Sequence, residues 1–157
     1  MKKIIQKSIN IIPWGIRDYI KNIPGLSAFQ RWLIKKYIGT ETFVHKINAG
    51  PACGLKIKIK LPEDKSIWTG KYENIFIDAI AKKIKPGMIC FDTGSYHGFV
   101  GGVMGVRGAK QVICFEPMPS NVEAIKTLIS LNTNLNITIK PYAVGAADKT
   151  EEFENMP

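Results

Sequence analysis

One segment of the 157-residue chain constrains the fold more than any other, an apolar run that ends in Asp92-x-Gly94-x-x-x-Gly98. It predicts a buried strand that turns sharply into a helix, with glycines where the backbone must approach a ligand closely. A second apolar run over 111–116 ends in Glu116, 24 residues after Asp92. A free helix N-terminus beside a carboxylate at the tip of the neighbouring strand is typical of nucleoside sites in α/β proteins.

Strand-like and helix-like patterns alternate around this segment, which predicts parallel strands joined by right-handed crossovers. Because the run at 88–92 is almost entirely apolar, we expect helices on both faces of the sheet. Ser120 or Asn121 should cap the helix after Glu116. The helix that ends before Pro86 should bury a stripe formed by Tyr72, Ile75, Phe76, Ala79 and Ile80. The other expected elements are strands at 42–47, 54–61, 88–92, 111–116 and about 137–142, and helices at about 97–106 and 120–131.

Positive charge is concentrated towards the N-terminus. Residues 1–60 contain 12 Lys or Arg and 2 Asp or Glu, whereas residues 61–157 contain 10 and 11. The excess indicates either an anionic partner such as a membrane surface or a solvated basic face. The pattern over 27–38 predicts a helix, and its apolar stripe either faces lipid or packs on the domain. No apolar run approaches the roughly 20 residues of a membrane span, so we predict a cytoplasmic protein with optional peripheral membrane contact.

Several blocks of this sequence match one known family in their order and spacing. They are Gly70-Lys71-Tyr72-Glu73, Lys85-Pro86-Gly87-Met88, the run from Phe91 to Phe99, the run from Phe115 to Asn121, Leu131-Asn132 and Ala143-Val144-Gly145. On these residues the chain resembles the FkbM-type S-adenosylmethionine-dependent methyltransferases between Trp68 and Phe153. Thr93 and three glycines after Gly98 depart from the family pattern. The resemblance implies a Rossmann-like, doubly wound parallel sheet of class I type.

The resemblance also implies which residues bind S-adenosylmethionine. Gly94 and Gly98 would wrap its methionine end, and Glu116 would accept hydrogen bonds from its ribose. Asp92 would orient the loop or hold the ammonium group, or it merely caps a helix. The remaining candidates are Ser95 and Tyr96 through backbone N–H groups, Pro117 beside Glu116, and Ala143 beside the adenine. The catalytic residues are not identified, and His97 is either a general base or simply the residue before a glycine turn.

Members of this family continue beyond the point that corresponds to Pro157. The resemblance therefore implies that this chain contains only the N-terminal half of the methyltransferase domain. We therefore expect a truncated reading frame with little methyl transfer. The predicted organisation is a basic helical arm at 1–40, a β-hairpin region at 41–66 and a partial methyltransferase domain at 67–157. The expected acceptor is a small-molecule or glycan hydroxyl, with no metal and no nucleic-acid partner. The alternatives are an inactive remnant, a basic surface-binding module or, less favoured by the glycine spacing, an NAD-binding domain.

Overall fold

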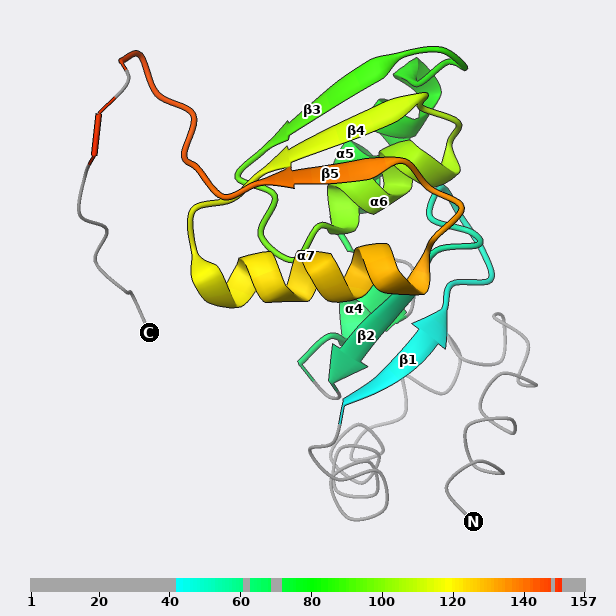
Figure 1. Ribbon diagram of the computed structural model, residues 1–157. Coiled ribbons are helices and arrows are strands. Elements are labelled where there is room, and N and C mark those ends of the chain that lie inside the picture. Colours follow the sequence, from blue (N-terminus) through cyan, green and yellow to red (C-terminus); the bar gives the residue numbers. More distant parts are fainter. Residues whose placement is uncertain (1–41, 61–62, 69–71, 148, 151–157) are drawn as a thin grey trace. The chain divides into compact units, whose positions relative to one another are not determined.

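The computed structural model describes residues 42–60, 63–68, 72–147 and 149–150 (Figure 1). The basic arm and its helix expected at 27–38 lie outside these residues. Two compact units divide the described chain, one containing 42–45 and 58–72 and the other containing 46–57 and the residues from 73 onwards. The elements are β1 (Thr42–Lys46), β2 (Lys56–Lys60), α4 (Lys65–Trp68), α5 (Asn74–Lys83), β3 (Ile89–Thr93), α6 (Phe99–Val106), β4 (Gln111–Phe115), α7 (Pro119–Leu131) and β5 (Ile137–Lys140).

The central feature is a three-stranded parallel sheet in the order β3-β4-β5. Ile89 pairs with Gln111 at one end of the β3–β4 ladder and Thr93 pairs with Phe115 at the other. Each parallel connection passes through a helix, as the alternating sequence pattern predicts. The prediction of adjacent, parallel strands near 88–92 and 111–116 is confirmed.

Helices cover one face of this sheet. The α6 helix packs against all three strands, α7 packs against β5, and α5 packs against α6. In Figure 1 these helices lie on the same side of the sheet. On that side Val112 and Cys114 are fully buried, whereas on the opposite side Ile89 and Phe91 are 53% and 60% exposed. Our expectation of helices on both faces is therefore wrong for the described residues, because no described helix packs against the second face.

Close packing explains the extra glycines of α6. A Cβ on Gly101 would lie 2.7 Å from the Cys114 Sγ, and a Cβ on Gly102 would lie 2.8 Å from Leu55 Cδ2. The helix therefore packs directly against β4 and against the loop before β2, and a side chain at either glycine would force Cys114 or Leu55 to shift. Gly101 and Gly102 therefore allow α6 to pack closely against β4 and Leu55.

The short sheet of β1 and β2 is the second feature. Along β2, buried Ile57 and Ile59 alternate with Lys56, Lys58 and Lys60. This period of two agrees with the strand predicted at 54–61. Lys60 also forms an ion pair with Glu63 at 3.4 Å, and the partial exposure of both side chains makes its contribution to stability small.

The α5 helix buries a different stripe from the one expected. Ile77 and Ala81 are buried, whereas Ile75 is 84% exposed and Phe76 is 53% exposed. Apolar residues occur on both sides of this helix, so helical periodicity alone allowed two stripes. Packing against α6 selects the side that carries Ile77 and Ala81.

Candidate functional site

The loop between β3 and α6 is held against the end of β4. The backbone N–H groups of Gly94 and Ser95 both donate to the Phe115 carbonyl, at 3.0 and 3.1 Å. The Ser95 hydroxyl donates to the carbonyl of Asp92 at 2.7 Å, and Gly98 N–H donates to the Ser95 carbonyl at 2.7 Å. The turn predicted after the first strand is thus present, and its conformation is fixed by hydrogen bonds to the neighbouring strand.

Gly94 and Gly98 have different physical roles in this loop. Both have a left-handed backbone conformation, with φ of 72° and 75°, which favours glycine. A Cβ on Gly98 would lie 3.1 Å from Ile125 of α7, so packing also requires a small residue there. A Cβ on Gly94 would meet no protein atom within 4 Å. Gly94 therefore borders open space, whereas Gly98 serves the packing of the helices.

Asp92, at the end of β3, points towards the start of α6. Its Oδ2 accepts a hydrogen bond from Gly101 N–H at 2.9 Å, in the first turn of the helix. The carboxyl is buried, and this desolvation raises its pKa, although the bonds from Gly101 and Ser95 act in the opposite direction. Among the roles that the sequence left open, this geometry matches helix capping.

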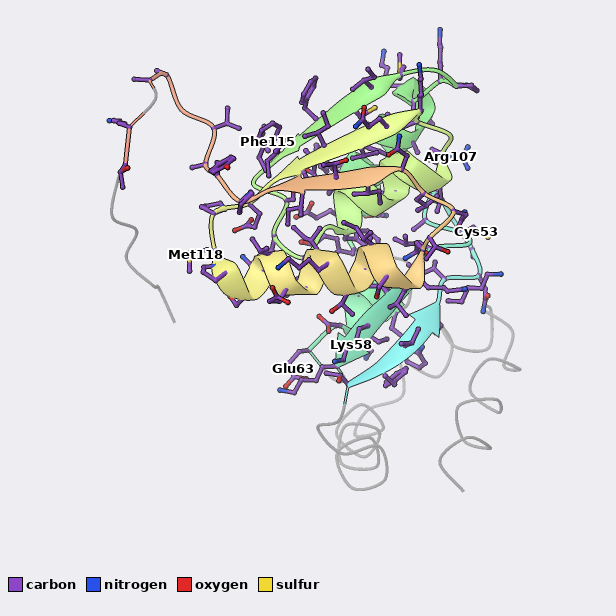
Figure 2. The ribbon with its side chains drawn as sticks, viewed as in Figure 1. Cys53, Lys58, Glu63, Arg107, Phe115 and Met118 are labelled. Atoms are coloured by element: carbon purple, nitrogen blue, oxygen red, sulfur yellow. The ribbon has the colours of Figure 1, made fainter. Side chains whose placement is uncertain are left out.

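Glu116 is the most constrained polar group of the site. Its side chain is only 4% exposed, and its two oxygens accept three hydrogen bonds. Tyr96 N–H donates to Oε2 at 2.8 Å, while Met118 N–H and Asn121 Nδ2 donate to Oε1 at 3.0 and 3.2 Å. Phe115 and Met118, which flank Glu116 in the sequence, lie near the same end of the sheet in Figure 2. The carboxylate therefore ties the β3–α6 loop to the start of α7.

Tyr96 projects from this loop into solvent. It is one of two described non-glycine residues with positive φ, at 50°, and its side chain is 56% exposed. Its ring stacks on His97, with ring centroids 3.7 Å apart. The Tyr96 N–H is already bonded to Glu116 and the Ser95 N–H to Phe115, so neither group donates to a cofactor in the observed conformation.

The structure brings most of the predicted site residues together. Hydrogen bonds join Asp92, Ser95, Tyr96 and Glu116, with Gly94 and Pro117 adjacent in the chain. Ala143 lies three residues beyond β5 in an exposed segment that runs away from the sheet in Figure 1.

Sequence reasoning missed the role of Asn121 in holding Glu116. It also assigned the cap of α7 wrongly, because Met118 occupies the cap position without a side-chain hydrogen bond. Pro119 at the first helical position starts the helix, since its fixed φ suits that place. The one sequence signal for the contact between Asn121 and Glu116 was their spacing, an asparagine five residues after the acid at the strand end.

The cysteine near the site is a packing residue. Cys114 is fully buried, and burial, together with the nearby charge of Asp92, raises the pKa of its thiol to about 11. At neutral pH the thiol is therefore protonated and behaves as a small apolar group. Within the described ranges, no group of three or more His, Cys, Asp or Glu side chains could hold a metal ion. None of the described helices is long and apolar enough to cross a membrane.

The described residues form a Rossmann-like α/β fold, in which the loop after the first parallel strand meets Glu116 at the end of the second. Two similar solved structures, both from Pyrococcus horikoshii, are the "putative transferase PH0793" and TYW2 in complex with MeSAdo. Their TM-scores are 0.51 and 0.50, each with 17% sequence identity over 77% of this chain. The chain spans 50% of the length of each of these proteins. It matches no protein-family model and no curated protein sequence.

Proposed function

We propose that this chain provides the cofactor-binding half of an S-adenosylmethionine-dependent methyltransferase. The observation that carries the proposal is Glu116, a buried carboxylate fixed at the end of β4 beside the open space at Gly94. Burying a charged group is costly unless hydrogen bonds compensate for the loss of water, and here three donors do so. The fold neighbour TYW2 in complex with MeSAdo, and the resemblance to FkbM-type enzymes, support the same assignment.

The hydrogen bonds of Glu116 limit how a ribose can bind. A carboxylate has about four acceptor positions, and three of them are occupied. Two ribose hydroxyls can therefore bind only if one present donor moves. Tyr96 N–H is the donor we propose to move, because it belongs to an exposed residue with a strained backbone conformation. Binding would then shift the β3–α6 loop and open the space beside Gly94 further.

Bound S-adenosylmethionine would supply an electrophilic methyl group. Within this chain, Glu116 would orient the ribose, and the Gly94 backbone would allow the remainder of the ligand to approach. The acceptor we propose is a hydroxyl of a small molecule or glycan, as in the family that the sequence resembles. Methyl transfer from labelled S-adenosylmethionine to simple alcohols, sugars and amines tests this class, and labelling of amines alone would refute it.

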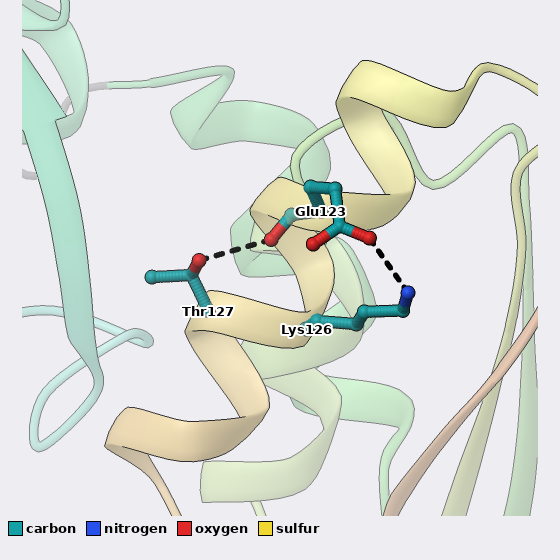
Figure 3. Close-up of polar contacts among 3 residues, drawn as sticks. All are labelled: Glu123, Lys126 and Thr127. Carbon is teal, nitrogen blue, oxygen red and sulfur yellow. Dashed lines mark hydrogen bonds and ion pairs between the residues drawn. The ribbon is translucent and has the colours of Figure 1, made fainter.

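Calorimetric titration of the 157-residue protein with S-adenosylmethionine tests the binding site. Glu116→Gln should weaken binding about 10- to 100-fold, the effect of losing charge-assisted hydrogen bonds worth roughly 1.5–3 kcal/mol. Glu123→Gln is the matched control, since Glu123 is exposed on α7 and bonds only within its own helix, to Lys126 and Thr127 (Figure 3). Circular dichroism would establish that both variants are folded. Equal affinity in the two variants, or no binding by the wild type, would refute the site.

The basic residues suggest a second property. Lys46, Lys56 and Lys58 are exposed in the β1–β2 sheet, next in sequence to the charged arm. We propose that the arm and this sheet associate weakly with anionic membrane surfaces, since each basic residue near such a surface adds attraction that salt screens. The protein should sediment with phosphatidylserine vesicles at low salt, and less so at high salt or when Lys56→Glu and Lys58→Glu are combined. Equal sedimentation with purely zwitterionic vesicles would contradict this.

A further inference from the structure

Asn121 contributes the only side chain among the three described donors to Glu116. Tyr96 and Met118 donate through backbone N–H groups, whereas Asn121 donates through its amide Nδ2, at 3.2 Å from Oε1. Asn121 lies in the first turn of α7 and is only partly buried. Its amide therefore lies at the boundary between the buried carboxylate and solvent, where a ligand of Glu116 would meet it.

Glu116 fixes the orientation of this amide. Every described partner of the Glu116 side chain is an N–H donor, so the carboxylate acts as an acceptor, and the amide must turn its nitrogen rather than its oxygen towards it. An amide nitrogen carries two hydrogens, and Oε1 takes one of them. The described residues provide no partner for the second N–H. One side-chain nitrogen thus holds Glu116 and retains a donor beside it.

A ribose hydroxyl needs more than Glu116 can supply. Like the hydroxyl of serine, it donates one hydrogen bond and also accepts. Glu116 can accept its proton but has nothing to donate to its oxygen. Oε1 already accepts two hydrogen bonds and Oε2 accepts one, so ligand hydroxyls would bind Oε2. A hydroxyl oxygen that loses water without gaining a donor weakens binding. The second N–H of Asn121 is the side-chain donor next to this carboxylate.

We propose that Asn121 is a second ribose-recognition residue, which donates from Nδ2 to the oxygen of one ribose hydroxyl while the same nitrogen holds Glu116. This inference rests on the proposed function and names a specificity-determining residue for its site. Glu116 and Asn121 then form an acceptor and a donor that match the two hydrogen-bonding roles of that hydroxyl. A ligand without the hydroxyl would leave both protein groups without a partner, so the site selects ribose over deoxyribose at that position.

Calorimetric titration of the full 157-residue protein with three ligands tests the proposal. The ligands are S-adenosylmethionine and the two analogues that lack one or the other ribose hydroxyl. Asn121→Ala should weaken binding of S-adenosylmethionine about 2- to 10-fold, the effect of losing one neutral hydrogen bond. The variant should weaken binding of one analogue to the same extent and binding of the other much less, because the latter lacks the hydroxyl that Asn121 contacts. This thermodynamic cycle identifies that hydroxyl.

Ser120→Ala is the matched control, because Ser120 is exposed in the same turn of α7. It should bind all three ligands as the wild type does. Alanine is the most favourable residue in helices, so both variants should fold, which circular dichroism would verify. Equal weakening of all three ligands in Asn121→Ala would indicate a structural role, and weaker discrimination at both hydroxyls would indicate that Asn121 only positions Glu116. Either result, or unchanged binding, would overturn the proposal.

The behaviour of Glu116→Gln separates this proposal from the proposed function. If Glu116→Gln binds S-adenosylmethionine more weakly while Asn121→Ala binds all ligands as Ser120→Ala does, the role of Asn121 is wrong and the cofactor site stands. If the wild type does not bind S-adenosylmethionine, or Glu116→Gln binds it equally well, the cofactor site is wrong, and the role of Asn121 is wrong with it.

Discussion

The close contact between α6 and β4 leads to a quantitative prediction for Gly101→Ala. The new Cβ would lie 2.7 Å from Cys114 Sγ and 3.1 Å from Asp92 Oδ2, so the helix or the strand must shift. Overpacking of a core typically costs about 1–3 kcal/mol, and replacing a helical glycine by alanine returns about 0.5–1 kcal/mol. We expect a net loss between about 0 and 2.5 kcal/mol in the free energy of unfolding, with a central value of about 1 kcal/mol, measured by urea denaturation.

A double-mutant cycle isolates the clash. Cys114→Ala removes the sulfur that the new methyl group meets, so the double variant should be more stable than the sum of the single effects by about 1 kcal/mol. Gly105→Ala is the control, because its Cβ would come no closer than 3.2 Å to Leu135 Cδ1, with Leu135 Cβ and Ile137 Cδ1 at the ordinary contact distances of 3.5 and 3.6 Å. That variant should be neutral or slightly stabilised. Strictly additive effects of Gly101→Ala and Cys114→Ala would refute the proposed contact.

Three further predictions concern buried polar groups. Burial raises the pKa of Asp92 in the folded state, so its contribution to stability is full below the unfolded pKa and is lost as the pH rises through the folded pKa. Urea denaturation should therefore show that Asp92→Asn loses less stability than the wild type as the pH rises above the ordinary aspartate pKa of about 3.9. Asn132→Ala should lower the free energy of unfolding by about 3 kcal/mol, since the side chain makes two hydrogen bonds to the Lys56 backbone and one to Leu128; a change below about 1 kcal/mol would contradict this. In native protein a thiol reagent should modify exposed Cys53 quickly and Cys114 only after unfolding, because the latter is buried with a pKa of about 11.

Much of the sheet could be predicted because its signals are local. The apolar runs before Asp92 and Glu116 marked two strands to within a residue or two, and the helical pattern between them implied parallel pairing. The same locality explains the errors. Nothing near Gly102 reveals that Leu55, 47 positions earlier, packs against it. The buried side of α5 depends equally on a distant neighbour, because both sides of that helix are apolar.

The candidate site was predictable in position but not in its hydrogen bonding. A strand-end acid at Glu116 follows from the alternating pattern, whereas its donors come from a left-handed residue, Tyr96, and from the turn before α7. Left-handed conformations outside glycine are uncommon and carry no reliable sequence signal. The sequence therefore indicated where the strand-end acid lies, without showing that the protein itself already occupies most acceptor positions of Glu116.

The pleat of β3 separates the proposed cofactor site from the opposite face of the sheet. Successive side chains of a strand point to opposite faces, so Asp92 faces α6 while Phe91 and Thr93 face away from it. A substitution at Phe91 therefore leaves the hydrogen bond between Asp92 and Gly101 in place. Phe91→Lys should bind S-adenosylmethionine in calorimetric titration as the wild type does. Loss of binding in that variant would show that the two faces of β3 are coupled.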